Sequence, residues 1–259
     1  MPLHRSGRLC AVVIVITVSL VSARGARAQT PPAGSQTEPT GSRWVVDLAF
    51  GVAPSINGNV NSGAIGTLQG QTVAILPQSY GNVYGTGIDF RFGAGYRLNA
   101  SSELRGMFVW QTADADLVRL GDLGLSSLYG QYSDYKSLAL DFGYRRYLSL
   151  NNPNVRVFGE ATIGIGFIDA IDVQLAAPQS NTIFSNTDFY DSTAAFTFGV
   201  NVGVLFKVAD RTDLTAQFGL RHVSGLAQVD QLVGTGLADL NDNSSRLTFP
   251  VVVGVRFHF

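Results

Sequence analysis

Cysteine and lysine are nearly absent from this sequence. The 259 residues include one cysteine, Cys10, and two lysines, Lys136 and Lys207. A single cysteine excludes an internal disulfide framework and a zinc site built on paired cysteines. The sequence contains no P-loop and no dinucleotide fingerprint, and its basic residues do not cluster. We therefore expect no cofactor and no nucleic acid partner.

The amino terminus has the three parts of a secretory signal peptide. A basic start with Arg5 and Arg8 precedes an apolar run over 9–23, and Ala26-Arg27-Ala28 follows as a small-x-small cleavage site. The run is shorter than the ~20 residues that a membrane-spanning helix needs. These features predict that residues 1–28 are removed during export.

Removal of this segment changes the composition and defines the predicted domains. It takes away Cys10 and four of the 18 basic residues, which leaves 14 Lys+Arg against 19 Asp+Glu and a net charge near −5. Residues 29–42 (QTPPAGSQTEPTGS) lack apolar periodicity, which predicts a flexible periplasmic tail. The remaining residues, 43–259, have a length that suits one domain.

The carboxyl-terminal segment alternates strictly between apolar and mixed positions. Phe249, Val251, Val253, Val255, Phe257 and Phe259 fall on one face of a strand, and the positions between them include Arg256 and His258. Pro250 cannot donate to a β-ladder, so we expect it at the outer rim or at a bulge.

Seven further segments show the same period of two. With the last one, the predicted strands cover residues 43–53, 86–97, 102–111, 136–147, 155–167, 194–208, 213–224 and 249–259. Each is close to the ~9–11 residues of a tilted transmembrane strand. We therefore predict an all-β fold, a closed antiparallel up-and-down transmembrane barrel of eight strands.

The connections alternate between short and long. Three are short turns, and the four long ones cover 54–85, 112–135, 168–193 and 225–245. Outer-membrane barrels have short periplasmic turns and long extracellular loops. An even strand number places both termini of the chain in the periplasm. Residues 72–76 can form a further short strand, so ten strands is the alternative.

Aromatic residues gather near the predicted strand ends, as in the girdles of membrane barrels. They are Trp44, Tyr96, Tyr144, Tyr147, Phe206 and Phe257 at one end and Trp110, Phe167 and Phe196 at the other. A soluble sandwich is the alternative fold, but it predicts no such clustering at strand ends.

The inward faces carry charges of both signs. They are Asp47, Asp89, Glu103, Asp141 and Glu160 with Arg91, Arg105, Arg145, Arg156, Lys207, Arg221 and Arg256. Such a set is compatible with a small-solute channel. Eight strands, however, leave an interior that side chains fill, and buried charges must pair. The sequence therefore favours a cross-barrel ion-pair network that plugs the interior.

The closing segment with its terminal Phe259 resembles the last strand of bacterial outer-membrane barrels, in which such residues are an assembly signal. Here the corresponding residues are Phe259, Phe257 and Val255. Residues 43–259 resemble the OmpA-type and opacity-protein barrels in their alternation and loop asymmetry. The resemblance implies an outer-membrane location and a role in membrane integrity or surface adhesion through the four loops. The implied partners are lipid and lipopolysaccharide, the barrel-assembly machinery, and an extracellular ligand at the loops.

One short motif suggests catalysis. His222 and Ser224 share the lipid-facing side at the outer end of the seventh strand, and His-x-Ser there resembles the outer-membrane lipid A deacylases. In that family the His is a general base for the Ser nucleophile, and a carboxylate orients the His. Gly225 stands where the family has Asn, and the last strand has no acid. The nearest acids, Asp230, Asp239 and Asp242, lie in the loop before it.

The remaining loop acids do not define a metal site. They are Asp114, Asp116, Asp122, Asp169, Asp172, Asp188 and Asp191, and their spacing matches no calcium-binding loop. We therefore expect no bound metal, and an enzymatic role depends on His222 and Ser224 alone.

Overall fold

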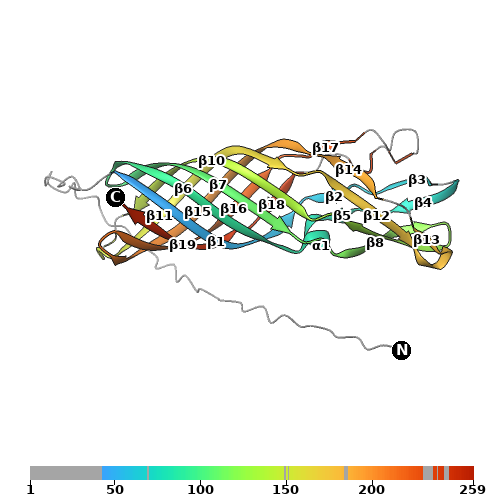
Figure 1. Ribbon diagram of the computed structural model, residues 1–259, viewed down its shortest axis with the longest axis horizontal. Helices are drawn as coiled ribbons and strands as arrows, with labels where there is room; N and C mark the ends of the chain where they lie inside the picture. The colour runs from blue at the N-terminus through green and yellow to red at the C-terminus, as the bar shows by residue number, and fades with distance from the viewer. Residues whose placement is uncertain are drawn as a thin grey trace, which may run out of the picture. The chain divides into compact units, whose positions relative to one another are not determined.

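The computed structural model describes residues 43–68, 70–148, 150, 152–183, 186–229, 236–237, 239–241 and 245–259. The predicted signal peptide and periplasmic tail lie outside these residues. In the described part of the chain, no helix has the length and apolar character to cross a membrane. Antiparallel strands form almost all of its regular structure (Figure 1).

All eight predicted segments are strands of one sheet. They are β1 (Trp44–Asn57), β6 (Thr86–Asn99), β7 (Ser102–Ala113), β10 (Tyr135–Leu148), β11 (Val155–Ile168), β15 (Thr193–Ala209), β16 (Thr212–Val223) and β19 (Val251–His258). Most extend slightly beyond the predicted ends, and β1 exceeds its prediction most, because Ser55 and Asn57 pair with β18 (Arg246–Thr248).

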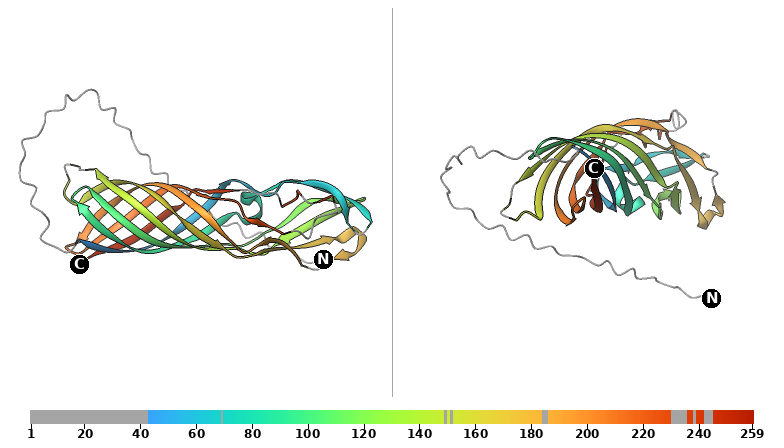
Figure 2. Two further views of the ribbon diagram at one scale, coloured as in Figure 1. Left: turned by 90° about the horizontal axis from the view of Figure 1, so that it is seen from above. Right: turned by 60° about the vertical axis from the view of Figure 1, so that its left-hand side comes forward.

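Strand pairing closes this sheet into a barrel. Each strand pairs antiparallel with its neighbour in sequence, from β1–β6 through β15–β16 to β16–β19. The first and last strands also pair, with Val45 opposite His258 and Val52 opposite Val251. The eight-stranded up-and-down barrel is therefore confirmed. Figure 2 shows the strong tilt of its strands, as closure requires.

The outward face of the barrel is apolar. On β16, Phe218 and Leu220 are exposed. Gln217 and Arg221, on the opposite face, are buried. The exposed belt includes Leu48, Phe50, Val52, Ile88, Phe90, Phe92, Leu104, Phe108, Trp110, Leu138, Phe142, Ile163, Ile165, Phe167, Phe196, Phe198, Val200, Val202, Leu214, Val251 and Val253. A belt of this extent is far larger than the apolar patches that soluble proteins leave in water. It is the lipid-facing surface of an outer-membrane-type barrel.

The four long connections, predicted as extracellular loops, contain strands of their own. They form a second sheet at the end of the barrel away from the carboxyl terminus (Figure 1). Its strands are β3 (Ala64–Leu68), β4 (Gln71–Ile75), β8 (Leu117–Leu123), β9 (Ser126–Tyr132), β12 (Ile171–Ala177), β13 (Thr182–Ile183), β14 (Thr187–Asp191) and β17 (Ala227–Gln228). Residues 72–76 thus do contribute a strand, β4, but to this extramembrane sheet and not to the barrel.

The extramembrane sheet has an apolar core of its own. Leu120 and Leu128 are among the largest fully buried side chains, and Tyr132 packs edge-on against Phe189 with ring centroids 5.4 Å apart. The cluster continues inward to Tyr135 and Val223 at the outer ends of β10 and β16. We call the second sheet with this core the outer sheet. Burial of these apolar side chains stabilises the described strands of the outer sheet.

Short elements join the outer sheet to the barrel. They are β2 (Asn59–Asn61), β5 (Gln78–Ser79), the helix α1 (Tyr80–Tyr84) and β18 (Arg246–Thr248). The 3₁₀ turn η1 (Pro178–Ser180) lies within the outer sheet, between β12 and β13. Ser79 caps α1, since its hydroxyl accepts a hydrogen bond from the Asn82 amide at 3.2 Å.

Pro250 lies where the ladder of the last strand is interrupted. β18 ends at Thr248 and β19 begins at Val251, so Phe249 and Pro250 belong to neither. The Pro250 carbonyl still accepts a hydrogen bond from the Gly219 amide at 3.1 Å. The interruption of the β-ladder that is expected at Pro250, which has no backbone N–H, is therefore present between β18 and β19.

Candidate functional site

The central interior of the barrel contains three arginines and three carboxylates. Arg256 is fully buried and forms two forked interactions from β19. Its Nε and Nη2 donate to the Asp47 carboxylate at 2.8 and 2.9 Å. Its Nη1 and Nη2 donate to the Glu103 carboxylate at 3.0 and 2.9 Å. Planar guanidinium groups suit such two-point contacts.

The same cluster continues across the barrel. Arg105 Nη2 donates to Asp47 at 2.8 Å, and Arg105 also pairs with Glu160. Arg145 Nε donates to Glu160 at 2.7 Å, and its guanidinium stacks 3.7 Å above the Phe158 ring. These contacts connect β1, β7, β10, β11 and β19. We call the six charged residues, Asp47, Glu103, Arg105, Arg145, Glu160 and Arg256, the central cluster.

A second charged layer lies nearer the outer sheet. Arg91 donates through Nε to Asp89 at 2.7 Å, and Gln111 donates to the same carboxylate at 2.9 Å. Arg221 pairs with Asp141, which also accepts a hydrogen bond from the Thr197 hydroxyl at 2.8 Å. The cavity left between the two layers measures about 10 Å³, which is the space of roughly one water molecule.

Both layers are electrically balanced and buried. The central cluster has three positive and three negative charges, and the second layer has two of each sign. Desolvated ions of this kind are costly unless each meets a partner of opposite charge. The arrangement connects strands across the lumen, and among the described residues no serine, cysteine or histidine hydrogen-bonds to these carboxylates.

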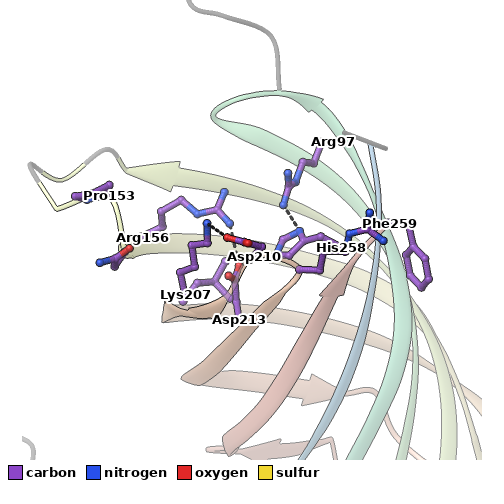
Figure 3. Close-up of a pocket in the computed structure, with 11 residues that line it drawn as sticks. Arg97, Pro153, Arg156, Lys207, Asp210, Asp213, His258 and Phe259 are labelled. Atoms are coloured by element: carbon purple, nitrogen blue, oxygen red, sulfur yellow. Dashed lines mark hydrogen bonds and ion pairs between the residues drawn. The ribbon is translucent and has the colours of Figure 1, made fainter. Parts of the chain in front are cut away.

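The mouth at the carboxyl-terminal end opens into a cavity of about 700 Å³ (Figure 3). In that view the Arg97 and His258 side chains point toward each other, and His258 Nε2 lies 2.8 Å from Asp213 Oδ2. Arg156 Nη2 pairs with the same carboxylate at 3.1 Å, and Lys207 pairs with Asp210 at 3.3 Å. Arg156, expected in the interior network, therefore lies at this mouth.

Several partners in the interior were not predicted. Tyr147, assigned to the aromatic girdle, points inward, and its hydroxyl donates to Glu103 at 2.8 Å. Its girdle assignment was wrong because β10 places Tyr144 outward and Tyr147 on the opposite face. Gln217 accepts from Arg145 at 3.2 Å. Their position on inward faces was the available signal, but tyrosine and glutamine carry no charge and did not stand out.

His222 and Ser224 have different surroundings. The Ser224 hydroxyl accepts a hydrogen bond from the Phe196 amide at 2.9 Å, at the outer end of β15. His222 lines a polar pocket of about 360 Å³ on the other side of β16, together with Asn57, Gly58, Asn59, Ser62, Ser245 and Leu247. Within the described part of the chain, no carboxylate hydrogen-bonds to His222. Asp230 and Asp242 lie outside the described residues.

The terminal residues of the predicted assembly signal are held by both neighbouring strands. Phe257 pairs with Val46 on β1 and with Thr212 on β16. Val255 pairs with Leu48 and Leu214. The rings of Phe257 and Phe259 are exposed on the outside of the barrel, and Figure 3 shows Phe259 pointing away from the mouth cavity.

No protein-family model matches the sequence, and no curated protein matches it significantly. Among solved structures, the chain is similar to Neisserial surface protein A, with 15% identity over 85% of this chain and 100% of that one, at a TM-score of 0.44. It is also similar to Ail of Yersinia pestis in complex with the heparin analogue sucrose octasulfate, with 13% identity over 83% of this chain and 99% of that one, at a TM-score of 0.36. The N-terminal β-barrel domain of Pseudomonas aeruginosa OprF is similar as well, with 12% identity over 85% of this chain and 99% of that one, at a TM-score of 0.36. Likeness at this level assigns no activity to the chain.

Proposed function

We propose that this protein is a structural and adhesive component of the outer membrane, with a plugged barrel as anchor and the outer sheet as an extracellular platform. In this orientation both termini of the barrel chain lie on the periplasmic side, and the outer sheet faces the surroundings. The observation that carries the proposal is the outer sheet itself, because its buried core joins described residues of all four connections.

The interior supports the role of an anchor and not of a pore. The balanced central cluster and the second layer fill an eight-stranded lumen, whose width suits side chains alone. The space left between them is of the order of one water molecule. A solute the size of a sugar or an amino acid has no path through these layers.

The outer sheet offers a surface suited to contact with another molecule. Large aliphatic side chains project into solvent at Ile65, Leu125 and Ile183, which are 75%, 107% and 75% exposed. They lie on β3, between β8 and β9, and on β13, so three of the four connections contribute exposed aliphatic groups to the proposed contact surface. The described acids of these connections also outnumber the bases, so a partner with apolar and basic groups fits best.

The test is adhesion by cells that display the protein. Adherence to laminin-coated and fibronectin-coated surfaces, and aggregation between displaying cells, are measured for wild type and for the triple variant Ile65→Ser, Leu125→Ser, Ile183→Ser. We expect the triple variant to lose most adherence while the barrel still folds. Leu138→Ser on the lipid belt is the matched control, with adherence retained. Adherence that survives replacement of all four connections by short turns refutes the adhesive role.

A second candidate function is hydrolysis of lipid A. The observation in its favour is the polar pocket beside His222, which lies where β16 leaves the lipid belt. Mass spectrometry of lipid A is compared between cells with wild type, with His222→Ala and without the protein. Loss of one acyl chain that depends on His222 assigns an enzyme. Unchanged lipid A in wild-type cells excludes hydrolysis and leaves the anchor role untouched.

A further inference from the structure

Arg246 is a buried cation without a carboxylate partner among the described residues. It lies on β18, with 2% of its surface exposed, at the inner boundary of the apolar cluster of the outer sheet. Its Nε donates to the Ser55 hydroxyl at 2.9 Å. In the described structure this is the single hydrogen bond of its guanidinium, and no ion pair accompanies it.

The other deeply buried arginines differ from it in this respect. Arg91, Arg105, Arg145, Arg221 and Arg256 each pair with at least one carboxylate. Burial of an ion without a counter-charge is strongly unfavourable, and proteins avoid it by pairing. Among the described residues, Arg246 therefore has no carboxylate partner of the kind that each of these other arginines has.

Tyrosine rings surround the Arg246 guanidinium. Its Cζ lies 4.0 Å from the centroid of the Tyr135 ring and 5.7 Å from that of Tyr80. Tyr84 completes the group, with its ring centroid 6.0 Å from Tyr135 and 6.1 Å from Tyr80. The ring faces offset part of the cost of burying the cation. They do not accept hydrogen bonds as a carboxylate does.

Three polar atoms of this group are buried without a partner. They are Arg246 Nη1, Tyr84 Oη and Tyr135 Oη. Unsatisfied buried donors are rare, and an ion or a water molecule at the site is one explanation for them. Burial raises the pKa of Tyr84, so its hydroxyl keeps its proton and acts as a donor. The group thus contains a positive charge together with buried phenol and guanidinium atoms that have no hydrogen-bond partner among the described residues.

We propose that Arg246, Tyr84 and Tyr135 bind a small monovalent anion, of the size of chloride or bromide. A metal cation is unsuited, since the group already contains the Arg246 charge. A water molecule satisfies the hydroxyls but leaves that charge without a counter-ion. The close packing of the rings, with centroids about 6 Å apart, favours a single atom over a larger oxyanion. The bound anion ties β18 to α1 and to the start of β10.

Bromide is the probe for a direct test. Crystals of the full protein are soaked in sodium bromide and measured at the bromine absorption edge. We expect an anomalous peak within hydrogen-bond distance of Arg246 Nη1 and the two phenol oxygens. The double variant Tyr84→Phe, Tyr135→Phe should lose the peak. Tyr132→Phe is the control and should keep it, because the Tyr132 hydroxyl accepts its hydrogen bond from Asn61 Nδ2 at 2.8 Å and is not one of the three atoms.

Urea unfolding in lipid vesicles gives an independent measurement. At constant ionic strength, replacement of gluconate by bromide should raise the urea concentration at the unfolding midpoint of the wild type, because a ligand that binds the folded state stabilises it. The double variant should show no bromide dependence, and Tyr132→Phe should respond like wild type. A site that shows water alone, or a bromide response unchanged in the double variant, overturns the proposal. Because the Tyr variants keep Arg246, the test does not depend on whether a variant without that arginine folds.

Discussion

At the scale of single residues, the barrel interior depends on charge balance. Glu103 is completely buried and accepts hydrogen bonds from Arg256 and Tyr147. Loss of its charge leaves Arg256 with Asp47 as its remaining carboxylate. A buried pair that loses one member is destabilised much more than an exposed pair, since the remaining ion has no water to solvate it.

We expect Glu103→Gln to lower the free energy of unfolding by about 3–5 kcal/mol, the range for breaking a buried ion pair. The measurement is urea unfolding in vesicles, followed by tryptophan fluorescence. Asp122→Asn is the matched control, because Asp122 forms an exposed pair with Arg119 at 2.7 Å and should contribute less than about 1 kcal/mol. Equal losses for the two variants contradict a structural role for the central cluster.

At the scale of elements, the outer sheet rests on local backbone geometry as well as on its core. Gly121 lies at the β-bulge of β8 with a φ of 153°. A Cβ atom there would lie 1.9 Å from the Ala74 carbonyl oxygen on β4. Any other residue must therefore push β4 and β8 apart, and the change stays far from the barrel.

Gly121→Ala should loosen the pairing of β4 with β8 and leave the barrel folded. We expect faster cleavage within residues 64–75 by an added protease, together with an unchanged shift on unheated gel electrophoresis, which reports the barrel. Gly124→Ala tests a nearby turn glycine, where a Cβ atom would meet only a side-chain oxygen at 3.6 Å. Alanine is also strained at the φ of 58° of Gly124. The comparison of the two variants therefore isolates the effect of the clash between a Cβ atom at position 121 and the Ala74 carbonyl. Equal cleavage of wild type and Gly121→Ala refutes this account.

The last strand has two separable roles, pairing and display of its terminal rings. Phe257 and Phe259 are exposed outside the barrel, so their side chains add little to the internal packing. We expect the double variant Phe257→Ser, Phe259→Ser to reduce assembly in cells severalfold, by loss of the proposed signal. Refolding from urea into vesicles should change much less. Matching losses in both assays indicate a stability effect and not recognition.

At the scale of the whole molecule, we propose that the closed barrel with its balanced internal layers anchors the outer sheet. Planar bilayers with the inserted wild-type protein should show no steady conductance. The paired variant Arg145→Gly, Glu160→Gly removes one charge of each sign, and with them the Arg145–Glu160 and Arg105–Glu160 pairs, so it leaves no net charge and should open a measurable leak. Steady wild-type conductance excludes the plug. Val200→Gly on the lipid belt is the control and should stay closed.

The sequence by itself determined the barrel. Alternation over eight segments places apolar side chains outward and charges inward, because a strand has a period of two and the bilayer solvates the outer face. The same alternation placed Asp47, Glu103 and Arg256 inside. These are local properties of each strand, which need no knowledge of its neighbours.

Only the tertiary structure decided which residues meet. The fork of Arg256 on Asp47 and Glu103 joins strands that lie far apart in the sequence, through a register that closure sets. The long connections showed no clear period, because their strands are short and bulged and their core is shared among four segments. Arg246 and its tyrosines come from three such segments. Local alternation carries no information on the contact between Arg246 and these tyrosines, since this contact forms only when separate hairpins bury their apolar faces together.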